Sequence, residues 1–398
     1  MWCSGERDGA RVIWWRPQMQ RTHGTVVGID VGNVDVRVVI GGTALDDEDT
    51  RVPVLGLGVT PAQGLARGAI ADARHLGDAI RTAVTQAEKA AGHRVLGGYF
   101  SVPLAQFASP ASRRECIVLQ SPIAVREMTL HATERTPAWR EVARHAGLEV
   151  VSIVPSVLPA TAAVALPEEH DGVVVIVECG AEHTSVAVFS GGAVVCLGSV
   201  PIGGDHITRD LATVLRIDPM EAERLKFEVG NTRSGASAVE VLVRGTDGAR
   251  TAVAVSLITA IITARVDQLL AHVSEIVRPA TTFSRGGGGI GHVVLCGGGA
   301  VLSGLAPMVR AALGMPVRVA GAWGFAGPTA IQSPGFAAVL GLLRWRATVE
   351  PMSESRPIGA RSAHSGTAVA TVNGGNFPVQ PMRIGQTRWQ AWLREFLP

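Results

Sequence analysis

A repeating pattern of apolar residues near the start of the chain predicts a β-hairpin. Residues 25–30 and 36–40 are rich in valine and isoleucine, and the segment between them contains Gly32. β-Branched residues favour strands, and glycine supplies the dihedral freedom that a hairpin turn needs. We therefore expect a strand, a tight turn and a second strand.

The same layout recurs in the middle of the chain. Residues 173–177, 184–189 and 193–200 are strand-like apolar runs, and turns that contain glycine separate them. Duplicated units of hairpins and helices that face a cleft form a recurrent phosphate-binding architecture. The repeat therefore indicates two related halves with a ligand cleft between them.

Apolar residues at helical spacing predict helices between these strands. Over 72–91 the apolar positions recur every three or four residues, and Gly92 follows as a C-cap. Asp218 and Pro219 have the residue types expected at the N-cap and the first position of a helix. The pattern predicts an α/β fold, with further strands at 95–102 and 293–296 and further helices at 139–146, 207–215, 219–229, 255–276 and 302–313.

Composition narrows the class of protein. The chain has 398 residues, a net charge of +2 and 47% hydrophobic residues, which is typical of a globular protein and excludes a disordered one. No stretch approaches the roughly 18 consecutive apolar residues of a membrane span, which excludes an integral membrane protein. The five cysteines are scattered without CxxC spacing, so the sequence indicates neither a disulfide framework nor a zinc site and fits a reducing cytoplasm.

Four glycine-containing turns carry candidate phosphate-binding chemistry. In Asp30-Val-Gly-Asn33, backbone N–H groups can surround phosphate oxygens, and the carboxylate can hold a hydrated Mg2+. The segment 178–184 supplies a similar turn, and Gly203-Gly204-Asp205 follows it one strand later. The turn Gly297-Gly298-Gly299 precedes a helix, whose N-terminus favours anions. Each turn alone is common, but their order along the chain is specific and predicts a nucleotide in a cleft.

With these motifs the sequence resembles the actin-like ATPase superfamily, in particular the FtsA family of bacterial cell-division proteins. The resemblance is carried by VVGIDVGNVDVRVV at 26–39, VPIGGDHITRDLATVLRIDPMEAERLKFEVG at 200–230, VVLCGGGAVLSGLAPMV at 293–309 and colinear stretches at 64–92, 146–164, 257–270 and 331–343. It implies an actin-like (ribonuclease H-like) duplicated fold, with two lobes around a cleft that binds ATP and Mg2+.

The resemblance also implies roles for individual residues. Asp30, which would hold Mg2+, and Glu178 match catalytic positions. Glu223 and Lys226 match contacts to the ribose and base, although the simpler interpretation is an ion pair between positions i and i+3 on a helix surface. Only Lys89 and Lys226 among the 36 basic residues are lysines, which hints at a special role for a compact ammonium. The other matched nucleotide-binding positions are Gly32, Asn33, Val34, Gly180, Thr184, Gly203, Gly204, Gly297, Gly298 and Gly299.

Two regions depart from the FtsA pattern. In the second phosphate loop, Glu182 would place negative charge where phosphate belongs, and like charges repel strongly at low dielectric. We therefore expect ATP hydrolysis to be weak or absent. This loop, ECGAEHTSVAVF, is closer to that of PilM, the FtsA-related protein of type IV pilus assembly. The insertion at 98–147 is shorter than the subdomain by which FtsA-like proteins contact each other, which leaves the polymer geometry open.

The last residues predict a membrane-targeting helix. In 387–397 the apolar residues fall on one helical face, arginines lie beside it, and tryptophans favour the membrane interface. A helix that follows a linker rich in Gly, Ser and Pro is typical of a tethered anchor, and the alternative is a helix docked on the protein's own core. The membrane-binding residues are Arg388, Trp389, Trp392, Leu393, Arg394, Phe396 and Leu397.

These expectations define the organisation of the chain. We expect a disordered N-terminal extension at 1–24, lobe I at 25–97 and 148–200, a shortened inserted subdomain at 98–147, lobe II at 201–345, a disordered linker at 346–386 and the C-terminal amphipathic helix at 387–398.

The function implied by the resemblance is that of a scaffold that tethers FtsZ filaments to the cytoplasmic face of the cell membrane at the division septum. Expected partners are the C-terminal tail of the tubulin-like protein FtsZ, contacted somewhere within 211–275, further copies of this chain in filaments, other divisome proteins and the anionic inner leaflet, with no nucleic acid. The alternatives are a PilM-like cytoplasmic component of type IV pilus assembly and a small-molecule kinase of the same superfamily, for which no catalytic acid at a substrate pocket is evident.

Overall fold

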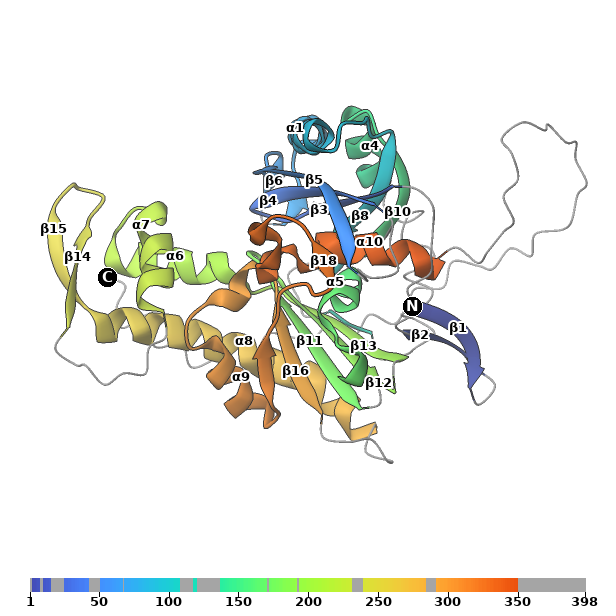
Figure 1. The fold of residues 1–398 in the computed structure, drawn as a ribbon. Coiled ribbons are helices and arrows are strands. Elements are labelled where there is room, and N and C mark those ends of the chain that lie inside the picture. Colours follow the sequence, from blue (N-terminus) through green and yellow to red (C-terminus); the bar gives the residue numbers. More distant parts are fainter. Residues whose placement is uncertain are drawn as a thin grey trace, which may run out of the picture.

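Two β-sheets and the helices around them form the framework of the protein (Figure 1). One layer of helices lies between the sheets, and other helices cover their outer faces. This arrangement confirms the expected α/β class. The computed structural model describes residues 2–7, 10–15, 25–42, 51–66, 68–107, 117–119, 137–169, 172–191, 193–230, 239–283 and 291–349.

The first sheet contains the hairpin predicted near the start of the chain. Its strand order is β10-β8-β3-β4-β5-β18, with β3 antiparallel to β4 and parallel to β8. Its strands are β3 (Val26–Val31), β4 (Asp35–Gly41), β5 (Val52–Pro61), β8 (Gly97–Val102), β10 (Glu149–Pro155) and β18 (Phe325–Ala326).

Two helices cover the outer face of the first sheet. Helix α1 (Ala73–Ala91) begins after Asp72, whose side chain accepts hydrogen bonds from the backbone N–H groups of the first turn. It ends at the expected cap Gly92, which has a φ of 77° and lies in the left-handed region. Helix α4 (Pro137–His145) packs beside α1 and buries Trp139.

The second sheet contains the repeated hairpin. Its order is β1-β2-β13-β12-β11-β16-β17, and β9 also pairs with β13. Strands β11 and β12 are antiparallel, whereas β16 runs parallel to β11. Its strands are β1 (Trp2–Arg7), β2 (Ala10–Trp15), β9 (Ile117–Leu119), β11 (Val173–Cys179), β12 (Thr184–Ser190), β13 (Ala193–Val200), β16 (His292–Cys296) and β17 (Val317–Val319).

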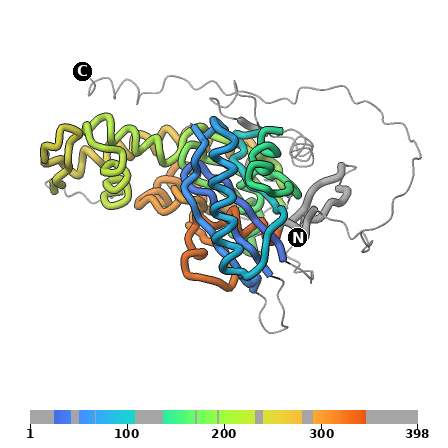
Figure 2. The backbone as a smooth tube through the Cα atoms, turned by 90° about the horizontal axis from the view of Figure 1, so that it is seen from above, coloured from blue at the N-terminus to red at the C-terminus, as the bar shows by residue number. Residues whose placement is uncertain are grey.

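The second sheet bears a projecting group of elements at one end. Helices α6 (Gly204–Leu215) and α7 (Pro219–Val229) join the hairpin of β14 (Glu240–Arg244) and β15 (Arg250–Ala254) in this group (Figure 2). The predicted cap Asp218 accepts a hydrogen bond from the backbone N–H of Met220 at 2.8 Å and so fixes the start of α7.

Helix α8 (Val255–Phe283) links this group to the outer face of the second sheet, where α9 (Leu305–Leu313) lies beside it. Among the described helices, α8 is long and apolar enough over Val255–Pro279 to cross a membrane by length and composition alone. It packs, however, on β12 and β13, and side chains such as Ile258, Val273 and Ile276 are fully buried in the core. The packing therefore makes α8 a core helix.

Helices α5 (Val157–Val164) and α10 (Ala337–Val349) fill the space between the two sheets (Figure 1). One hydrophobic cluster contains residues of both helices, Val154 from the first sheet and Ile176 and Val294 from the second. The two halves thus share a core through α5 and α10.

The structure corrects several expected boundaries. Strands β11 to β13 pair with β16, so 173–200 belongs to the second half and not to lobe I. Within 98–147, β8 lies inside the first sheet and α4 packs on α1, so these parts are not a separate subdomain. Sheet pairing is a long-range property, which local patterns do not reveal. Helix α10 also continues to Val349, beyond the expected start of the linker.

The expected disorder of residues 1–24 is also wrong for part of that segment. Trp2–Arg7 and Ala10–Trp15 form an antiparallel pair, and Trp14 pairs with Ala193 at the edge of β13. The run Ala10–Trp15 is rich in β-branched and aromatic residues, which suit a strand at a sheet edge.

Glu169 ties together elements at the end of the second sheet. It ends a short 3-10 helix (Pro167–Glu169), and Arg318 on β17 donates hydrogen bonds of 2.7 and 2.6 Å to its carboxylate. His292 Nε2 lies 2.9 Å from Glu169 Oε1. Burial alone would raise the pKa of Glu169, but His292 and Arg318 together lower it to about 2.

Acid should therefore weaken the fold through Glu169. Because the pKa of this carboxyl is lower in the folded chain than its ordinary 4.5, its stabilisation is fully present above about pH 4.5 and is lost as the pH falls toward 2. We expect Glu169→Gln to lower the melting temperature by roughly a few degrees near neutral pH, and this deficit should shrink on acidification. Thermal unfolding of both proteins across this range measures it, and a constant deficit would contradict the assignment.

Candidate functional site

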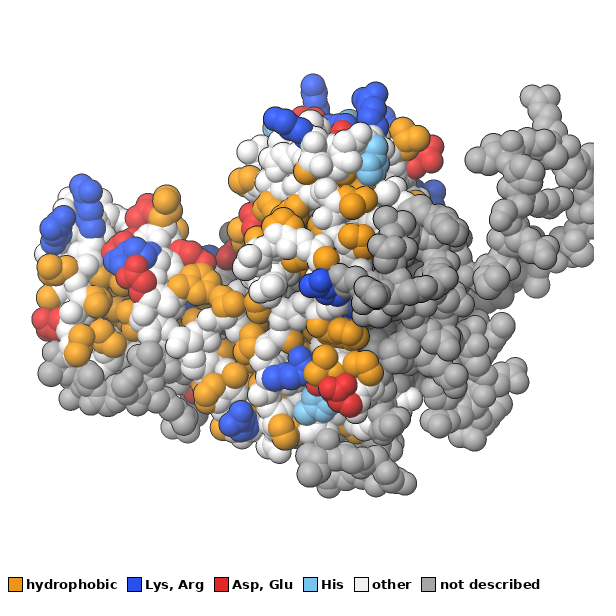
Figure 3. Space-filling model, viewed as in Figure 1, with side chains coloured by type: hydrophobic (Ala, Val, Ile, Leu, Met, Phe, Trp, Pro, Cys, Tyr) orange, Lys and Arg blue, Asp and Glu red, His pale blue; other side chains and the backbone are white. Residues whose placement is uncertain are grey.

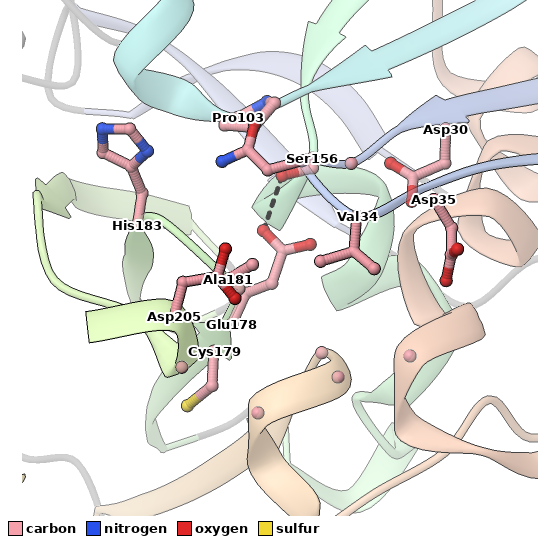
Figure 4. A pocket seen from close by; sticks show the side chains of 18 of the residues that line it. Asp30, Val34, Asp35, Pro103, Ser156, Glu178, Cys179, Ala181, His183 and Asp205 are labelled. Atoms are coloured by element: carbon pink, nitrogen blue, oxygen red, sulfur yellow. Dashed lines mark hydrogen bonds between the residues drawn. The ribbon is translucent and has the colours of Figure 1, made fainter. Parts of the chain in front are cut away.

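A cleft lies between the two sheets, and most of the predicted nucleotide-binding residues line it (Figure 4). Its volume is about 240 Å³. The first sheet contributes the turn after β3, and the second contributes the turns after β11 and β16 and the start of α6. The cleft brings together Asp30, Gly32, Asn33, Val34, Glu178, Gly180, Gly204, Glu223, Lys226, Gly297, Gly298 and Gly299.

Two predicted residues, Thr184 and Gly203, lie just behind this lining. The Oγ1 of buried Thr184 donates a 2.8 Å hydrogen bond to the carbonyl of Ile202 and ties β12 to the segment after β13. A Cβ on Gly203 would lie 2.3 Å from the carbonyl oxygen of Ala181, so only glycine allows these two turns to meet. Both residues support the second phosphate loop and do not face the cavity.

Asp30 lies near the end of β3 and is a buried residue, with only 6% of its surface exposed. Ser101 Oγ donates a 2.7 Å hydrogen bond to Asp30 Oδ1, and Arg37 Nη1 lies 3.9 Å from Oδ2. Burial raises the pKa of Asp30, and Arg37 and Ser101 partly oppose this effect. Arg37 and Ser101 therefore do not fully offset the cost of burying the charged form of Asp30.

Glu178 approaches Asp30 from the second sheet. Its Oε2 accepts a 2.6 Å hydrogen bond from Ser156 Oγ, which the dashed line in Figure 4 marks. Burial raises the pKa of Glu178 to about 8, and the negative charge of Asp30 adds to this rise, whereas Ser156 opposes it. The two carboxyls thus form an acidic pair across the cleft. Their raised pKa values favour the protonated forms, and a bound cation would favour the charged ones.

This pair suits Mg2+ only together with a nucleotide. Over the described ranges, no cluster of three or more His, Cys, Asp or Glu side chains is arranged to hold a metal ion. Mg2+ usually keeps several waters and binds through one or two carboxylates plus substrate phosphates. Asp30 and Glu178 can supply those carboxylates, and the bound ion would supply charge neutralisation between them and the phosphates.

Backbone and amide groups around the cleft fit phosphate and ribose. Helix α6 begins at Gly204, which lines the cavity, so the positive end of the helix dipole lies beside it and favours an anion. The first N–H groups of this helix already donate to backbone carbonyls of the protein, so the helix contributes its dipole there rather than free donors. A Cβ on Gly298 would meet no atom within 4 Å, so this backbone faces open space that a ligand can approach. Asn33 Oδ1 is buried and has no hydrogen-bond partner among the described residues, so this acceptor is available to a donor of the ligand, such as a hydroxyl group.

Lys226 and Glu223 form the ion pair of the simpler interpretation, but they form it inside the cleft. Lys226 Nζ lies 2.6 Å from Glu223 Oε2, 3.0 Å from Thr208 Oγ1 and 3.3 Å from the carbonyl oxygen of Gly204. A lysine ammonium has three protons to donate, so these acceptors account for all of them. Lys226 is 4% exposed, so it fastens α7 to the start of α6 and presents the carboxylate of Glu223 to the cavity.

Glu182 does not place its charge among the phosphate-binding groups, contrary to the expectation from the sequence. Its carboxylate accepts a 2.7 Å hydrogen bond from Arg209 Nη2 on α6 and is absent from the described cleft lining. Asp205 lines the cleft instead, and burial, reinforced by the charge of Glu182, raises its pKa. An additional carboxyl group therefore does lie beside the cleft, but it belongs to Asp205 and not to the second phosphate loop.

Several residues that line the cleft received no binding role from the sequence, although two of them, His183 and Asp205, belong to the predicted phosphate-binding turns. These residues are Arg37, Ser156, Asp205, His183 and Phe227. Arg37 on β4 is the one with a usable signal, because its alternation along the strand places it on the same side as Asp35, with which it forms a 3.0 Å ion pair. The others are brought in by turns and by the packing of α6 and α7.

The predicted membrane-binding residues, Arg388 to Leu397, lie outside the described residues. The same is true of the expected linker from residue 350 onward. Their role remains a prediction from the sequence.

Comparison with known proteins supports the family resemblance. The family model of the cell division protein FtsA matches residues 175–341, which contain the second phosphate loop and the glycine turn after β16. FtsA of Bacillus subtilis (strain 168) is 27% identical over 351 residues, which cover 74% of this chain and 78% of the relative. The resemblance to FtsA stated from the sequence motifs is confirmed.

Solved structures confirm the actin-like fold. The PilM-PilN type IV pilus biogenesis complex contains a chain with a TM-score of 0.56 and 17% identity, and the match covers 83% of this chain and 100% of that one. MreB5 of Spiroplasma citri, solved bound to ADP, has a TM-score of 0.55 and 14% identity, and the match covers 82% and 96%. At these identities the likeness concerns the fold alone.

Proposed function

We propose that this chain, an actin-fold protein that resembles FtsA, is a cell-division scaffold that tethers FtsZ filaments to the cytoplasmic face of the membrane at the septum. The observation that carries the proposal is the cleft between the two sheets. It gathers both phosphate loops and the glycine turn after β16 in a chain whose curated relatives are cell-division proteins. Self-association into filaments and contacts with other divisome proteins belong to the same proposal.

ATP with Mg2+ is the proposed ligand of the cleft. Asp30 and Glu178 would hold the ion with the phosphates, and Glu223 would accept a hydrogen bond from the ribose. The dipole of α6 would favour a phosphate near the start of that helix. The charge balance favours slow turnover, because Arg37 and Lys226 are already paired with carboxylates while Asp205 adds a further acid. The nucleotide would then act chiefly by setting the conformation of the two lobes.

The projecting group is the proposed FtsZ-binding region. Met220 is 83% exposed on α7, and Leu242 on β14 is 66% exposed. Figure 3 shows hydrophobic side chains over this part of the surface. Exposed apolar side chains of this kind are typical of a protein-interaction surface, and they fall within the expected range 211–275.

Membrane attachment is assigned to residues 387–397. A short amphipathic helix binds lipid weakly on its own, so many anchors along one filament would act together. FtsZ recruitment to lipid should therefore depend on this segment and on the ability of the scaffold to polymerise.

Co-sedimentation with liposomes tests the proposal. Full-length protein with Mg-ATP should bring purified FtsZ down with anionic liposomes, and truncation after Arg383 should abolish this recruitment. A matched variant, Arg383→Ala, keeps the helix and should behave like wild type. FtsZ lacking its C-terminal tail should stay in the supernatant. Lipid binding without any FtsZ recruitment would refute the division assignment.

A PilM-like role in type IV pilus assembly is the second candidate. The solved PilM chain matches over its whole length, and the ECGAEHTSVAVF loop is similar to that of PilM. Binding to the cytoplasmic segment of an inner-membrane pilus protein, together with failure to bind FtsZ, would favour it.

A further inference from the structure

A small turn from the first half of the molecule touches the second half beside the cleft. Strands β6 (Leu65–Ala66) and β7 (Ala69–Ile70) form a short hairpin, whose turn contains Gly68. A Cβ on Gly68 would lie 2.5 Å from His183 Cε1 and 3.5 Å from Asn33 Nδ2. The turn therefore rests directly on the ring of His183, with Asn33 of the first phosphate loop next to it.

The turn is fastened to its own half of the molecule. The side-chain amide of buried Gln106 donates a hydrogen bond to the carbonyl of Gly68. Gln106 lies in the short 3-10 helix Leu104–Phe107, which directly follows β8 of the first sheet. The hairpin also leads straight into α1, because the backbone N–H of Asp72 donates to Gly64 O at 3.0 Å. The turn must therefore move with the first sheet.

His183 is fastened to the other half. It lies in the turn between β11 and β12, and its carbonyl accepts a 3.0 Å hydrogen bond from the N–H of Gly180. The contact between Gly68 and His183 thus joins the two halves directly across the cleft, apart from the core that they share through α5 and α10. Any rotation that separates the two sheets on this side has to break it.

The contact lies at the end of the cleft formed by the phosphate loops. Figure 4 shows His183 at one end of the cavity, Asp30 and Asp35 at the other, and Glu178 between them. His183 and Asn33 both line the cavity, one from each half. A ligand held by these loops has the Gly68 turn beside it.

We propose that His183 is a positioning residue that, with Gly68, closes this end of the cleft, and that a bound nucleotide leaves only after the contact opens. The inference rests on the proposed function, because it needs a nucleotide in the cleft. It concerns the rate of exchange and not the identity of the ligand.

The residue types of Gly68 and His183 explain why the two halves can come into contact here. Gly68 has a φ of 72° and no side chain, so its backbone reaches the imidazole ring. Any Cβ there would act as a wedge between the halves. The ring supplies a flat surface that reaches across the cleft, which alanine at 183 would remove.

The test is the dissociation rate of N-methylanthraniloyl-ATP with Mg2+, measured by stopped-flow displacement with excess ATP. His183→Ala and Gly68→Ala should each raise this rate by about tenfold. His183→Phe keeps a ring of similar size and should restore a rate close to wild type. Gly92→Ala is the matched control, because Gly92 has a similar φ of 77° but a Cβ there meets nothing within 4 Å. That variant should dissociate like wild type.

A second measurement does not depend on nucleotide. Hydrogen exchange of the amides in residues 64–72 should become faster in nucleotide-free His183→Ala and remain slow in His183→Phe. Unchanged dissociation in His183→Ala and Gly68→Ala would overturn the inference while leaving the proposed function intact. If the wild-type chain fails to bind the fluorescent nucleotide, the proposed ligand of the cleft is wrong, and the role of the contact between Gly68 and His183 in nucleotide release is wrong with it. A rate increase that His183→Phe does not restore would also overturn the positioning role.

Discussion

Gly341→Ala is expected to lower the free energy of unfolding by about 3 kcal/mol. Gly341 lies in α10 where this helix crosses α5, and a Cβ there would lie 1.7 Å from the carbonyl oxygen of Pro159. Backbone cannot yield as a flexible side chain can, so the two helices must separate. In an exposed helix the same change would add stability, because alanine has the higher helix propensity.

Urea denaturation of both proteins measures this difference. Gly172→Ala serves as the control, because a Cβ on Gly172 would meet nothing within 4 Å, and we expect its unfolding midpoint to match that of wild type. If Gly341→Ala unfolds at the wild-type midpoint or above it, the close crossing of α5 and α10 is wrong.

Lys226→Ala is expected to weaken ATP binding by at least about tenfold, equivalent to about 1.4 kcal/mol. Loss of the ammonium leaves Glu223, Thr208 and the carbonyl of Gly204 without their shared donor. The start of α6 then loses the ammonium that links it to α7, and the carboxylate of Glu223 keeps only the hydrogen bond from the Thr208 hydroxyl to orient it. Isothermal titration with Mg-ATP gives the dissociation constant.

The other lysine of the chain provides the matched control. Lys89 is exposed on α1 and does not line the cleft, so Lys89→Ala should bind Mg-ATP like wild type. Lys226→Arg should not rescue binding, because a planar guanidinium does not fit three acceptors grouped around a point charge. Equal affinity of Lys226→Ala and wild type would remove this residue from the site.

Elements with strong local signals could be predicted from the sequence. The β3–β4 hairpin, α1 with its Gly92 cap and α7 with its Asp218 cap all follow from residue types within a few positions. Helices α5 and α10 gave no comparable signal, because α5 and the first half of α10, Ala337–Leu343, are enclosed between the sheets and contain few polar residues, which removes helical periodicity.

The candidate site shows the same division. Asp30, Asn33 and the glycines of the four turns belong to local motifs, and the structure brings most of them together. Asp205 and His183 became part of the cleft only through the packing of α6 and of the turn after β11, and Glu182 turned away because Arg209 lies beside it. Such outcomes depend on neighbours that are distant in the sequence or on competition between partners.

The layer of α5 and α10 also limits how the molecule can be taken apart. Their side chains lie in one cluster with residues of both sheets, and α10 comes from the C-terminal end of the described chain, whereas α5 lies near its middle. A fragment cut between β10 and β11 would expose this shared apolar surface on both pieces. We therefore expect neither half to be obtained as a stable fragment, and heating should melt the described chain in a single cooperative transition.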